Sequence, residues 1–366
     1  MVFVFGLSLL FLFLIFISKN SDYSVFDNIR ISFVKTFILI SCLIVAFTEF
    51  LSFFNMINYK NILIFWMIIC LILVIILLKN CEKLKIFFIK LKNINLYIKK
   101  NYFIVLCFTI VFLLLPLIFI AYYYPPNTGD SLGYHLPRIE HWIKNHNVNH
   151  YPVSDIRQLF CQVLPEFIIL HLNLLSKSDF FANYVQFFAM IGSVCLVTLL
   201  IKFLSLNYKF QILSALLTIS ISMGILQSTS TQTDYVGSFF LLSAIYFILL
   251  FFKNNNFNNI IFSALALSLG FFAKLTIAIF SFPFFIWFFV LIVTKYKKYF
   301  FKITGIFVLV FILINGLFYY RNYRFTGNIF GGSEVSAMMQ NQKNECTLFY
   351  FQHYKKFIIT FGISFG

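Results

Sequence analysis

Long apolar runs of membrane-spanning length dominate this sequence. A helix needs about 20 mostly apolar residues to cross the hydrocarbon core of a bilayer. Runs that approach this length lie at 2–18, 33–54, 61–78, 102–121, 180–201, 210–226, 235–252, 259–273, 275–294 and 303–319. Residues 2–18 lack the basic leader and the small-residue cleavage site of a signal peptide, so we interpret them as the first span. The pattern predicts an all-α polytopic membrane protein with about ten transmembrane helices.

The charge composition excludes several other classes of protein. Only 11% of the 366 residues are charged, whereas a soluble domain carries about 25%. This excludes an ordinary cytosolic enzyme, a disordered chain and a disulfide-stapled secreted module. The net charge is +16, but the basic residues lie mainly in short gaps between apolar runs. We therefore expect them to set membrane topology; membrane lipid is the expected partner, and nucleic acid is not.

Two lysine-rich gaps predict the orientation. Residues 79–101 contain seven Lys and a single acid, Glu82, and residues 295–302 contain four Lys. Both gaps are expected on the cytoplasmic side, and the six predicted spans between them form an even number, so the two assignments agree. Segment 122–179 is then external. We expect a multi-pass protein of the inner or plasma membrane.

Segment 122–179 concentrates the ionisable residues of the chain. It contains five of the twelve acids and five of the six His, and such groups near a membrane tend to mark function. Tyr122–Tyr124 have the position of an aromatic belt, Pro125 and Pro126 end the preceding helix, and Asp130 could cap the next one.

Two short helices are expected in this segment. The residues Leu132, Leu136, Ile139 and Ile143 follow each other at spacings of 4, 3 and 4, which predicts an amphipathic helix lying in the membrane interface. Pro137 must then lie in its first turn or kink it. A second short helix is expected at about 166–175, beginning with Glu166 after Pro165.

The run from Tyr124 to Trp142, YPPNTGDSLGYHLPRIEHW, resembles the first outer loop of bacterial GT-C glycosyltransferases. These enzymes are relatives of the protein O-mannosyltransferases and the lipid A aminoarabinose transferases. Weaker stretches typical of the same group follow in the expected order, at 151–152, 157–159, 164–166, 226–234, 273–276 and 321–328.

The resemblance implies a division of the chain. Residues 1–101 are N-terminal transmembrane helices with a basic cytoplasmic loop, to which the resemblance adds nothing over 1–80. Residues 102–332 are a GT-C-like catalytic region with its outer loop at 122–179, and 333–366 are a C-terminal segment that we expect to be truncated.

The resemblance also implies an activity. It indicates a glycosyltransferase that moves a sugar from a polyprenyl-phosphate donor to a cell-envelope acceptor, with inversion, on the periplasmic or outer side. The acid of the first loop would be the general base, which here is Asp130. The mannosyltransferases carry an acidic pair at this point, whereas Asp130 is followed by Ser131, so no second neighbouring acid is carried over.

The remaining site residues are assigned by their chemistry. Cations suit the donor phosphate, and the external candidates are Arg138, Lys274, Arg321 and Arg324. Acceptor or sugar binding is assigned to His135, Glu166, Arg157 and Asp234. Structural alternatives stay open: a helix cap for Asp130 and Asp234, a first-turn acid for Glu166, and snorkelling for Arg321 and Arg324.

Metal and cysteine chemistry receive no support from spacing. His135, His141, His146 and His150 form no HExxH pattern, so no metal ligand is assigned, although a divalent cation stays open as a cofactor. Cys161 and Cys346 lie outside the apolar runs without a spacing that supports a bridge. Glu49 could mark a proton path within its span, but a place near the outer helix end is favoured.

Two other functions remain as alternatives. A transporter or flippase for lipid-linked saccharides would call for ionisable residues at mid-membrane and related halves, whereas here the charges gather in one loop. A polysaccharide polymerase would share the donor class. The sequence names neither the sugar nor the acceptor, nor the oligomeric state.

Overall fold

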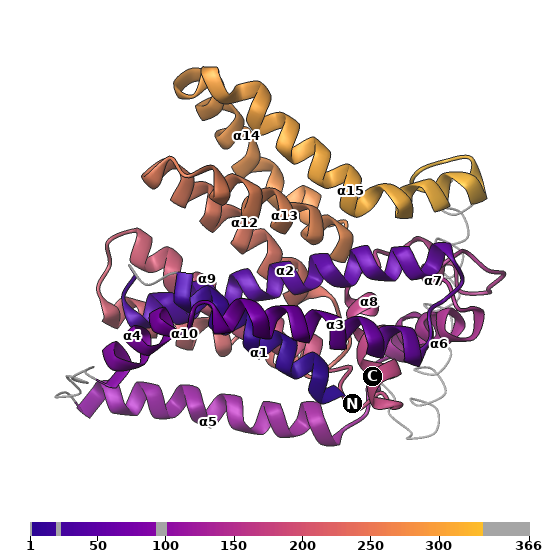
Figure 1. The fold of residues 1–366 in the computed structure, drawn as a ribbon, viewed down its shortest axis with the longest axis horizontal. Helices are drawn as coiled ribbons and strands as arrows, with labels where there is room; N and C mark the ends of the chain where they lie inside the picture. Colours follow the sequence, from indigo (N-terminus) through magenta and orange to yellow (C-terminus); the bar gives the residue numbers. More distant parts are fainter. Residues whose placement is uncertain (1, 20–22, 93–100, 332–366) are drawn as a thin grey trace, which may run out of the picture. The chain divides into compact units, whose positions relative to one another are not determined.

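The computed structural model describes residues 2–19, 23–92 and 101–331, without the side chains of 101–107, and these ranges contain helices but no β-strand (Figure 1). The predicted C-terminal segment 333–366 lies outside the described residues. In chain order the helices are α1 (Val2–Lys19), α2 (Val25–Phe53), α3 (Tyr59–Leu78), α4 (Cys81–Lys92), α5 (Asn101–Tyr123), the π-helical turn η1 (Ser131–His135), α6 (Leu136–Asn145), α7 (Arg157–Phe160), α8 (Leu164–Ser176), α9 (Tyr184–Phe203), α10 (Tyr208–Ile219), α11 (Ser222–Ser228), α12 (Asp234–Asn254), α13 (Phe257–Ala273), α14 (Ile277–Lys295), the 3₁₀ turn η2 (Lys297–Tyr299) and α15 (Phe300–Thr326).

Every apolar run identified in the sequence lies on a helix, but fewer than ten of these helices can span a bilayer by themselves. Seven are long and apolar enough, and the pair α10 and α11, bent by 69°, would make an eighth. Helix α13 and the fully described part of α5, Phe108–Tyr123, are shorter. The all-helical, multi-pass prediction is therefore confirmed, while the count in the described ranges is seven or eight rather than about ten.

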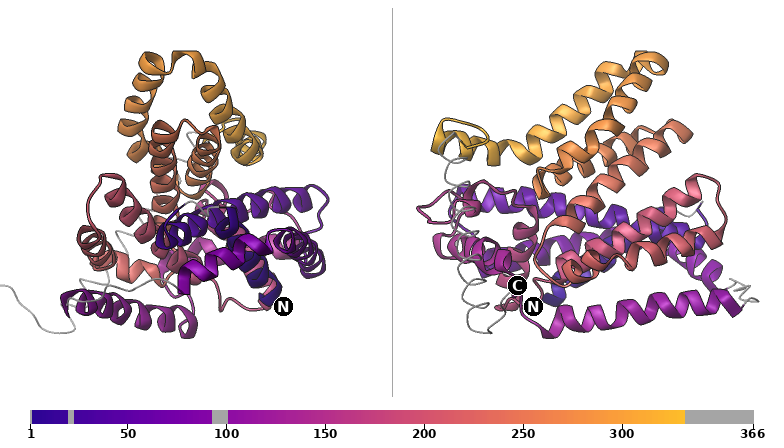
Figure 2. Two further views of the ribbon diagram at one scale, coloured as in Figure 1. Left: turned by 60° about the vertical axis from the view of Figure 1, so that its left-hand side comes forward. Right: turned by 180° about the vertical axis from the view of Figure 1, so that it is seen from behind.

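The chain divides into two compact units. Among the described residues, the first unit lies within 1–148 and 162–316, and the second comprises 149–161 and 317–331. Within the first unit, α12 packs along α13 and α9, while α1 packs along α3. Figures 1 and 2 show the α12–α13 pair side by side from each direction.

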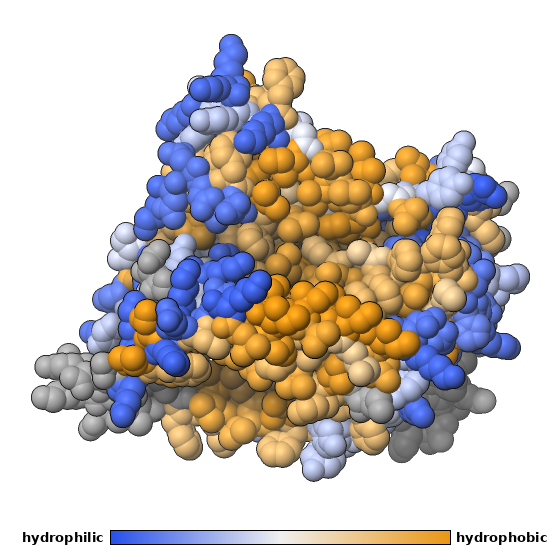
Figure 3. Space-filling view, viewed as in Figure 1, coloured by the Kyte–Doolittle hydropathy of each residue, from blue (hydrophilic) through white to orange (hydrophobic). Residues whose placement is uncertain are grey.

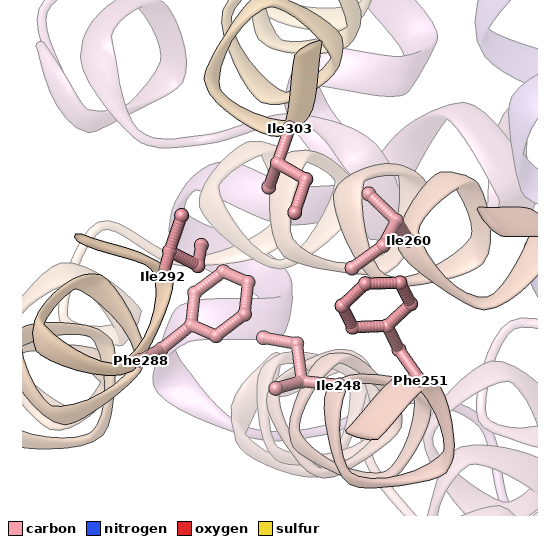
Figure 4. Close-up of a cluster of buried hydrophobic side chains, with 6 residues drawn as sticks. All are labelled: Ile248, Phe251, Ile260, Phe288, Ile292 and Ile303. Carbon is pink, nitrogen blue, oxygen red and sulfur yellow. The ribbon is translucent and has the colours of Figure 1, made fainter. Parts of the chain in front are cut away.

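Aromatic and β-branched side chains join α12 and α13 to the helices that follow them. Figure 4 shows Ile248 and Phe251 from α12 and Ile260 from α13 meeting Phe288, Ile292 and Ile303 from α14 and α15. All six are buried. Since lipid tails are as apolar as these residues, van der Waals packing rather than water exclusion holds such helices together.

A glycine of α9 makes room for a phenylalanine ring of α12. A Cβ atom added at Gly192 would lie 2.5 Å from Cδ2 of Phe239, which is a severe overlap. Small residues at helix interfaces permit such backbone approach in membrane proteins.

The surface of the helices is apolar along much of their length. Phe282, Phe289 and Phe301 of α14 and α15 are exposed, the last by 87%, and Figure 3 shows hydrophobic residues gathered over the middle of the helices on one face, with hydrophilic residues toward helix ends. An exposed apolar surface of this kind suits contact with lipid.

The turn between α2 and α3 is tied to segment 122–179. The backbone N–H of Ile57 donates to the carbonyl of His146 at 3.0 Å, and Ser52 Oγ accepts from the N–H of Val148 at 2.9 Å. The α2–α3 turn and this part of the segment thus lie at the same end of the bundle, as an even number of intervening spans requires.

A buried histidine strengthens the same junction. Trp66 Nε1 of α3 donates to Nδ1 of His171 in α8 at 3.0 Å, so the proton of the neutral ring lies on Nε2, 2.9 Å from Oγ1 of Thr48 in α2. Burial lowers the pKa of His171 to about 3, which keeps the ring neutral and its tautomer defined. Helix α8 is thereby fixed to both α2 and α3.

The lysine-rich gap contains a helix that the sequence reasoning did not single out. Leu84 and Phe87 of α4 pack with Ile17 of α1, while Lys83, Lys85 and Lys90 are exposed. At the end of the bundle where α4 lies, Asp27 of α2 forms ion pairs with Arg30 and with Lys202 of α9.

Candidate active site

The helix that follows the aromatic belt begins two residues before the π-helical turn. Helical residues start at Gly129, and the N–H of Ser131 donates to Oγ1 of Thr128 at 3.1 Å. Thr128 therefore fills the capping role that the sequence left open as an alternative for Asp130, whose own side chain makes no capping hydrogen bond. The Asp130 carboxylate instead accepts a hydrogen bond from a distant part of the chain.

The π-helical turn explains how Pro137 is accommodated. The N–H of Leu136 donates to the carbonyl of Ser131, five residues back, and the helix then continues as α6 with Pro137 in its first turn. A widened turn relieves the clash between a proline ring and the preceding turn. Such turns are frequent at functional sites.

Asp130 lies against the Ser/Thr-rich stretch between α11 and α12. Its Oδ2 accepts from Nε2 of Gln232 at 3.0 Å, and the neighbouring Ser131 Oγ accepts from Oγ1 of Thr231 at 2.7 Å. Asp130 is half-buried and Ser131 is fully buried. Two stretches about a hundred residues apart that the sequence analysis identified separately thus meet at the candidate base.

Asp234 and Lys274 form the next pair along. Thr233 holds the cap position of α12 and Asp234 begins the helix, where its carboxylate is 2.5 Å from Nζ of Lys274 at the end of α13. Each side chain is roughly one-third exposed (40% and 31%). The alternative of a helix cap for Asp234 is excluded, because Thr233 holds the cap position and the Asp234 side chain pairs with a cation.

Three other predicted site residues form a buried cluster. Glu166 Oε1 is 2.8 Å from Nδ1 of His135 and 3.1 Å from Nη1 of Arg138, and all three side chains are at most 1% exposed. Burial by itself would raise the pKa of Glu166, but the charge of Arg138 and the contact with His135 outweigh it and hold the pKa below its ordinary value. Glu166 therefore remains a carboxylate at neutral pH.

Gln162 connects this cluster with the Lys274 loop. Its carbonyl accepts from Nη1 of Arg138 at 3.1 Å, and its side-chain Oε1 accepts from the N–H of Leu275 at 3.2 Å. The adjacent N–H of Val163 donates to the carbonyl of Phe272 at 3.1 Å. The regions around residues 130, 166, 232 and 274 are thus joined through hydrogen bonds and short chain segments.

Gln162 and Gln232 were not identified from the sequence. Both lie next to or within stretches that carry the resemblance, but an uncharged amide gives no charge signal. Their position beside Pro165–Glu166 and Asp234 was the only indication that they would matter.

The second unit contains the other predicted cations. Arg157 forms a two-pronged ion pair with Asp155, with Nη2 2.7 Å from Oδ2 and Nε 3.0 Å from Oδ1. Arg321 and Arg324 line a cavity of about 420 Å³ together with His150. His150 is oriented by Asn322, whose Oδ1 is 2.9 Å from its Nε2.

In the described part of the chain, no three His, Cys, Asp or Glu side chains come together as a metal-ligand set. Cys161 is a free thiol, and Cys346 lies outside the described residues. Glu49 is buried in the last turns of α2, close to the α2–α3 turn, in agreement with the favoured place near a helix end.

Comparison with known proteins identifies a family over part of the chain. The profile of the family described as dolichyl-phosphate-mannose-protein mannosyltransferase matches residues 163–318, which include Glu166, Gln232, Asp234 and Lys274. No curated protein and no solved structure matches the chain. The resemblance to GT-C enzymes is confirmed over these residues, which are similar to a GT-C-type family of membrane glycosyltransferases.

Proposed function

We propose that this protein transfers a sugar from a polyprenyl-phosphate donor to a cell-envelope acceptor on the outer side of the membrane, with Asp130 as the general base. The observation that carries the proposal is the hydrogen bond from Gln232 to the half-buried Asp130 carboxylate. It brings the acid of the loop motif against the region that matches the mannosyltransferase family.

A single displacement fits one carboxylate. Asp130 takes the proton of the acceptor hydroxyl while that oxygen forms a bond to the anomeric carbon of the sugar. The bond from that carbon to the phosphate oxygen breaks, and its electron pair leaves with the polyprenyl phosphate. Attack opposite the leaving group inverts the anomeric centre, and the developing positive charge on the sugar resembles that in glycoside hydrolysis. The amide of Gln232 orients the carboxylate for this step.

The cations divide into accessible and buried groups. Lys274 of the first unit is partly exposed, so we assign the donor phosphate to it. Arg321 and Arg324, which line a cavity of the second unit, stay candidates for the same role. Arg138 is completely buried against Glu166, and therefore we assign it a positioning role: with His135 and Glu166 it fixes the helix that carries Asp130. Asp234 holds Lys274, and Arg157 stays a candidate for acceptor binding.

The orientation of the site rests on the loops. The lysine-rich gap 79–101 favours a cytoplasmic location for α4, and an odd number of spans, α5 alone, separates it from Asp130. An external Asp130 can meet a lipid-borne sugar whose tail remains in the bilayer. A divalent cation stays open as a further partner of the phosphate.

The test is sugar transfer by isolated membranes supplied with a panel of radiolabelled polyprenyl-phosphate sugars. Loss of a general base costs about 10²- to 10⁴-fold in rate, so Asp130→Asn should reduce transfer by that factor at normal expression. Asp130→Glu should keep part of the activity. Glu82→Gln removes an exposed carboxylate from α4 and is the matched control with unchanged transfer.

Wild-type transfer by Asp130→Asn would remove the base assignment. Movement of intact lipid-linked sugar across vesicle membranes, unaffected by Asp130→Asn and without cleavage of the donor, would instead indicate a flippase. Growth of a repeat-unit polymer from the purified protein would indicate a polymerase.

A further inference from the structure

A second cavity, with a mixed polar and apolar lining, lies at the far end of α8 from Glu166. It has a volume of about 530 Å³ and is lined by three elements of the first unit: the start of α3, one face of α6 and the end of α8. Its principal side chains are Tyr59, Leu136, Glu140, Asn173, Lys177 and Asp179. The volume falls within the range of about 300–1,000 Å³ that is typical of small-molecule sites.

The two faces of α6 separate this cavity from the buried cluster. Arg138 is directed to Glu166, whereas Leu136 and Glu140, one turn apart, line the cavity. Along α8, Asn173 follows Glu166 by seven residues, or about 10 Å at the rise of an α-helix. The cavity is thus a site separate from the buried cluster. A ligand of several rings could span the distance between them.

One buried polar group in this cavity lacks a partner. Asn173 is 7% exposed, and its Oδ1 makes no hydrogen bond with any described residue. A buried amide oxygen without a donor is costly. Oδ1 itself has almost no accessible surface, so a ligand that brings hydroxyl or N–H donors satisfies it once the amide turns toward the cavity.

The charges of the cavity select against a phosphate. Glu140 and Asp179 are exposed carboxylates, and Lys177, the one cation among the lining residues, lies 5.1 Å from the ring centre of Tyr59. The net charge of the lining is negative, and the carboxyl end of α8 adds the negative pole of its helix dipole. Carboxylate and amide oxygens are acceptors only or mainly acceptors, so the preferred ligand is a neutral one with many donors.

We propose that this cavity binds a neutral, hydroxyl-rich saccharide, the part of the acceptor that lies away from the reacting hydroxyl. Glu140, Asp179 and Asn173 accept its hydroxyl protons, and Tyr59 with Leu136 contacts its apolar C–H face. The assignment as an acceptor subsite rests on the proposed glycosyl transfer, whereas the binding of saccharide does not. The acceptor class that follows is a glycan or glycolipid rather than a bare peptide.

The experiment measures binding and transfer separately. The purified full chain in nanodiscs is mixed with free glucose, mannose, galactose and N-acetylglucosamine and with their neutral di- and trisaccharides, and binding is followed by saturation-transfer NMR. We expect at least one of the longer saccharides to bind, and Glu140→Gln to weaken it by about tenfold, the value of one hydrogen bond to a charged group. Glu140 is exposed, so this isosteric change leaves the fold intact; Asp179→Asn provides an independent second variant.

Asp130→Asn serves as the control that distinguishes the two proposals. It should bind saccharide like the wild type while losing transfer, and Glu140→Gln should raise the KM for the acceptor with kcat and the KM for the donor unchanged. The saccharide proposal is overturned if no member of the panel binds the wild type, if binding survives in both Glu140→Gln and Asp179→Asn, or if phosphoethanolamine occupies the cavity in its place. Failure of the base assignment would appear as transfer by Asp130→Asn and would leave the binding result untouched.

Discussion

Neutralising Glu166 tests the buried cluster on which the position of Asp130 depends. In Glu166→Gln the side chain keeps its shape and one acceptor oxygen but loses the charge that faces Arg138 at 3.1 Å and His135 at 2.8 Å. The guanidinium of Arg138, which is 0% exposed, is then a buried cation without a counter-charge. Removing one member of a buried pair costs about 3–5 kcal/mol, and the retained oxygen favours the lower figure.

The loss is large compared with the stability of a typical protein, which is about 5–15 kcal/mol. In proteins of 150–250 residues 1 kcal/mol corresponds to about 2–4 °C in Tm, and in longer chains to less, so a loss of about 3 kcal/mol should lower the Tm of this 366-residue chain by at most about 6–12 °C. The assay is thermal unfolding of the purified protein in detergent, read by size-exclusion fluorescence. Glu140→Gln, on the same loop but exposed, is the matched control and should shift the free energy of unfolding by less than about 0.5 kcal/mol.

A double variant separates charge from packing. Arg138→Met combined with Glu166→Gln removes both charges, and should be less destabilised than the sum of the single variants because no unpaired charge remains. A wild-type Tm in Glu166→Gln, or strict additivity in the double variant, would refute the account.

The same cluster predicts a pH dependence. The pKa of Glu166 is lower in the folded protein than its ordinary value of 4.5, so its contribution to stability is fully present above that value and is lost as the pH falls toward and through the folded pKa. The Tm difference between wild type and Glu166→Gln should therefore be constant from pH 7 to 5 and shrink below about pH 4.5. A difference that grows on acidification would contradict the assigned direction.

Three further predictions concern other parts of the first unit. Lys274→Met should lower the free energy of unfolding by less than about 1 kcal/mol, because its partner Asp234 is partly exposed. It should nevertheless reduce sugar transfer at least tenfold, and Lys274→Arg should restore part of the transfer. Equal transfer by the wild type and both variants would remove Lys274 from the phosphate site. Gly192→Ala should destabilise the protein by about 1–3 kcal/mol through overlap with Phe239, measured as a drop in Tm, while Gly305→Ala, whose new Cβ would contact nothing within 4 Å, serves as the control and should not lower it. In a background without native cysteines, Asn55→Cys and Asn147→Cys should react with a membrane-impermeant maleimide from the same side of sealed vesicles, because Asn147 Nδ2 donates to Oδ1 of Asn55 at 2.7 Å. Lys85→Cys should react from the other side. Labelling of residues 55 and 147 from opposite sides would invalidate the topology.

Much of the architecture could be predicted from the sequence because the bilayer imposes a simple length rule. The apolar runs correspond to helices, but length alone did not show that α10 and α11 are bent by 69° or that α13 is short. Helix α4 was not predicted, because it buries only Leu84 and Phe87 among many lysines. Two apolar positions give only a weak helical periodicity in the sequence. These features depend on tertiary packing.

The candidate site was predicted in its composition but not in its pairing. The sequence indicated Asp130, Glu166, Asp234 and Lys274, and the structure joins Asp234 to Lys274 and Glu166 to Arg138. The choice of partner depends on contacts between residues 28 to 102 positions apart, for which local spacing carries no information. Gln162 and Gln232 were missed for the same reason: their role follows from where neighbouring helices end.

The junction of the α2–α3 turn with residues 145–148 has a consequence for protein engineering. Segment 122–179 is not an autonomous module, because Ser52 and Ile57 satisfy its backbone and Thr48 and Trp66 enclose His171. The family match does not reach the first three helices. Deleting them would nevertheless remove these partners of α8 and of residues 146–148, and would release the helix that carries Asp130. A minimal expression unit must therefore retain α2 and α3. A separate polypeptide that contains α2 and α3 should restore the fold of a chain that lacks them.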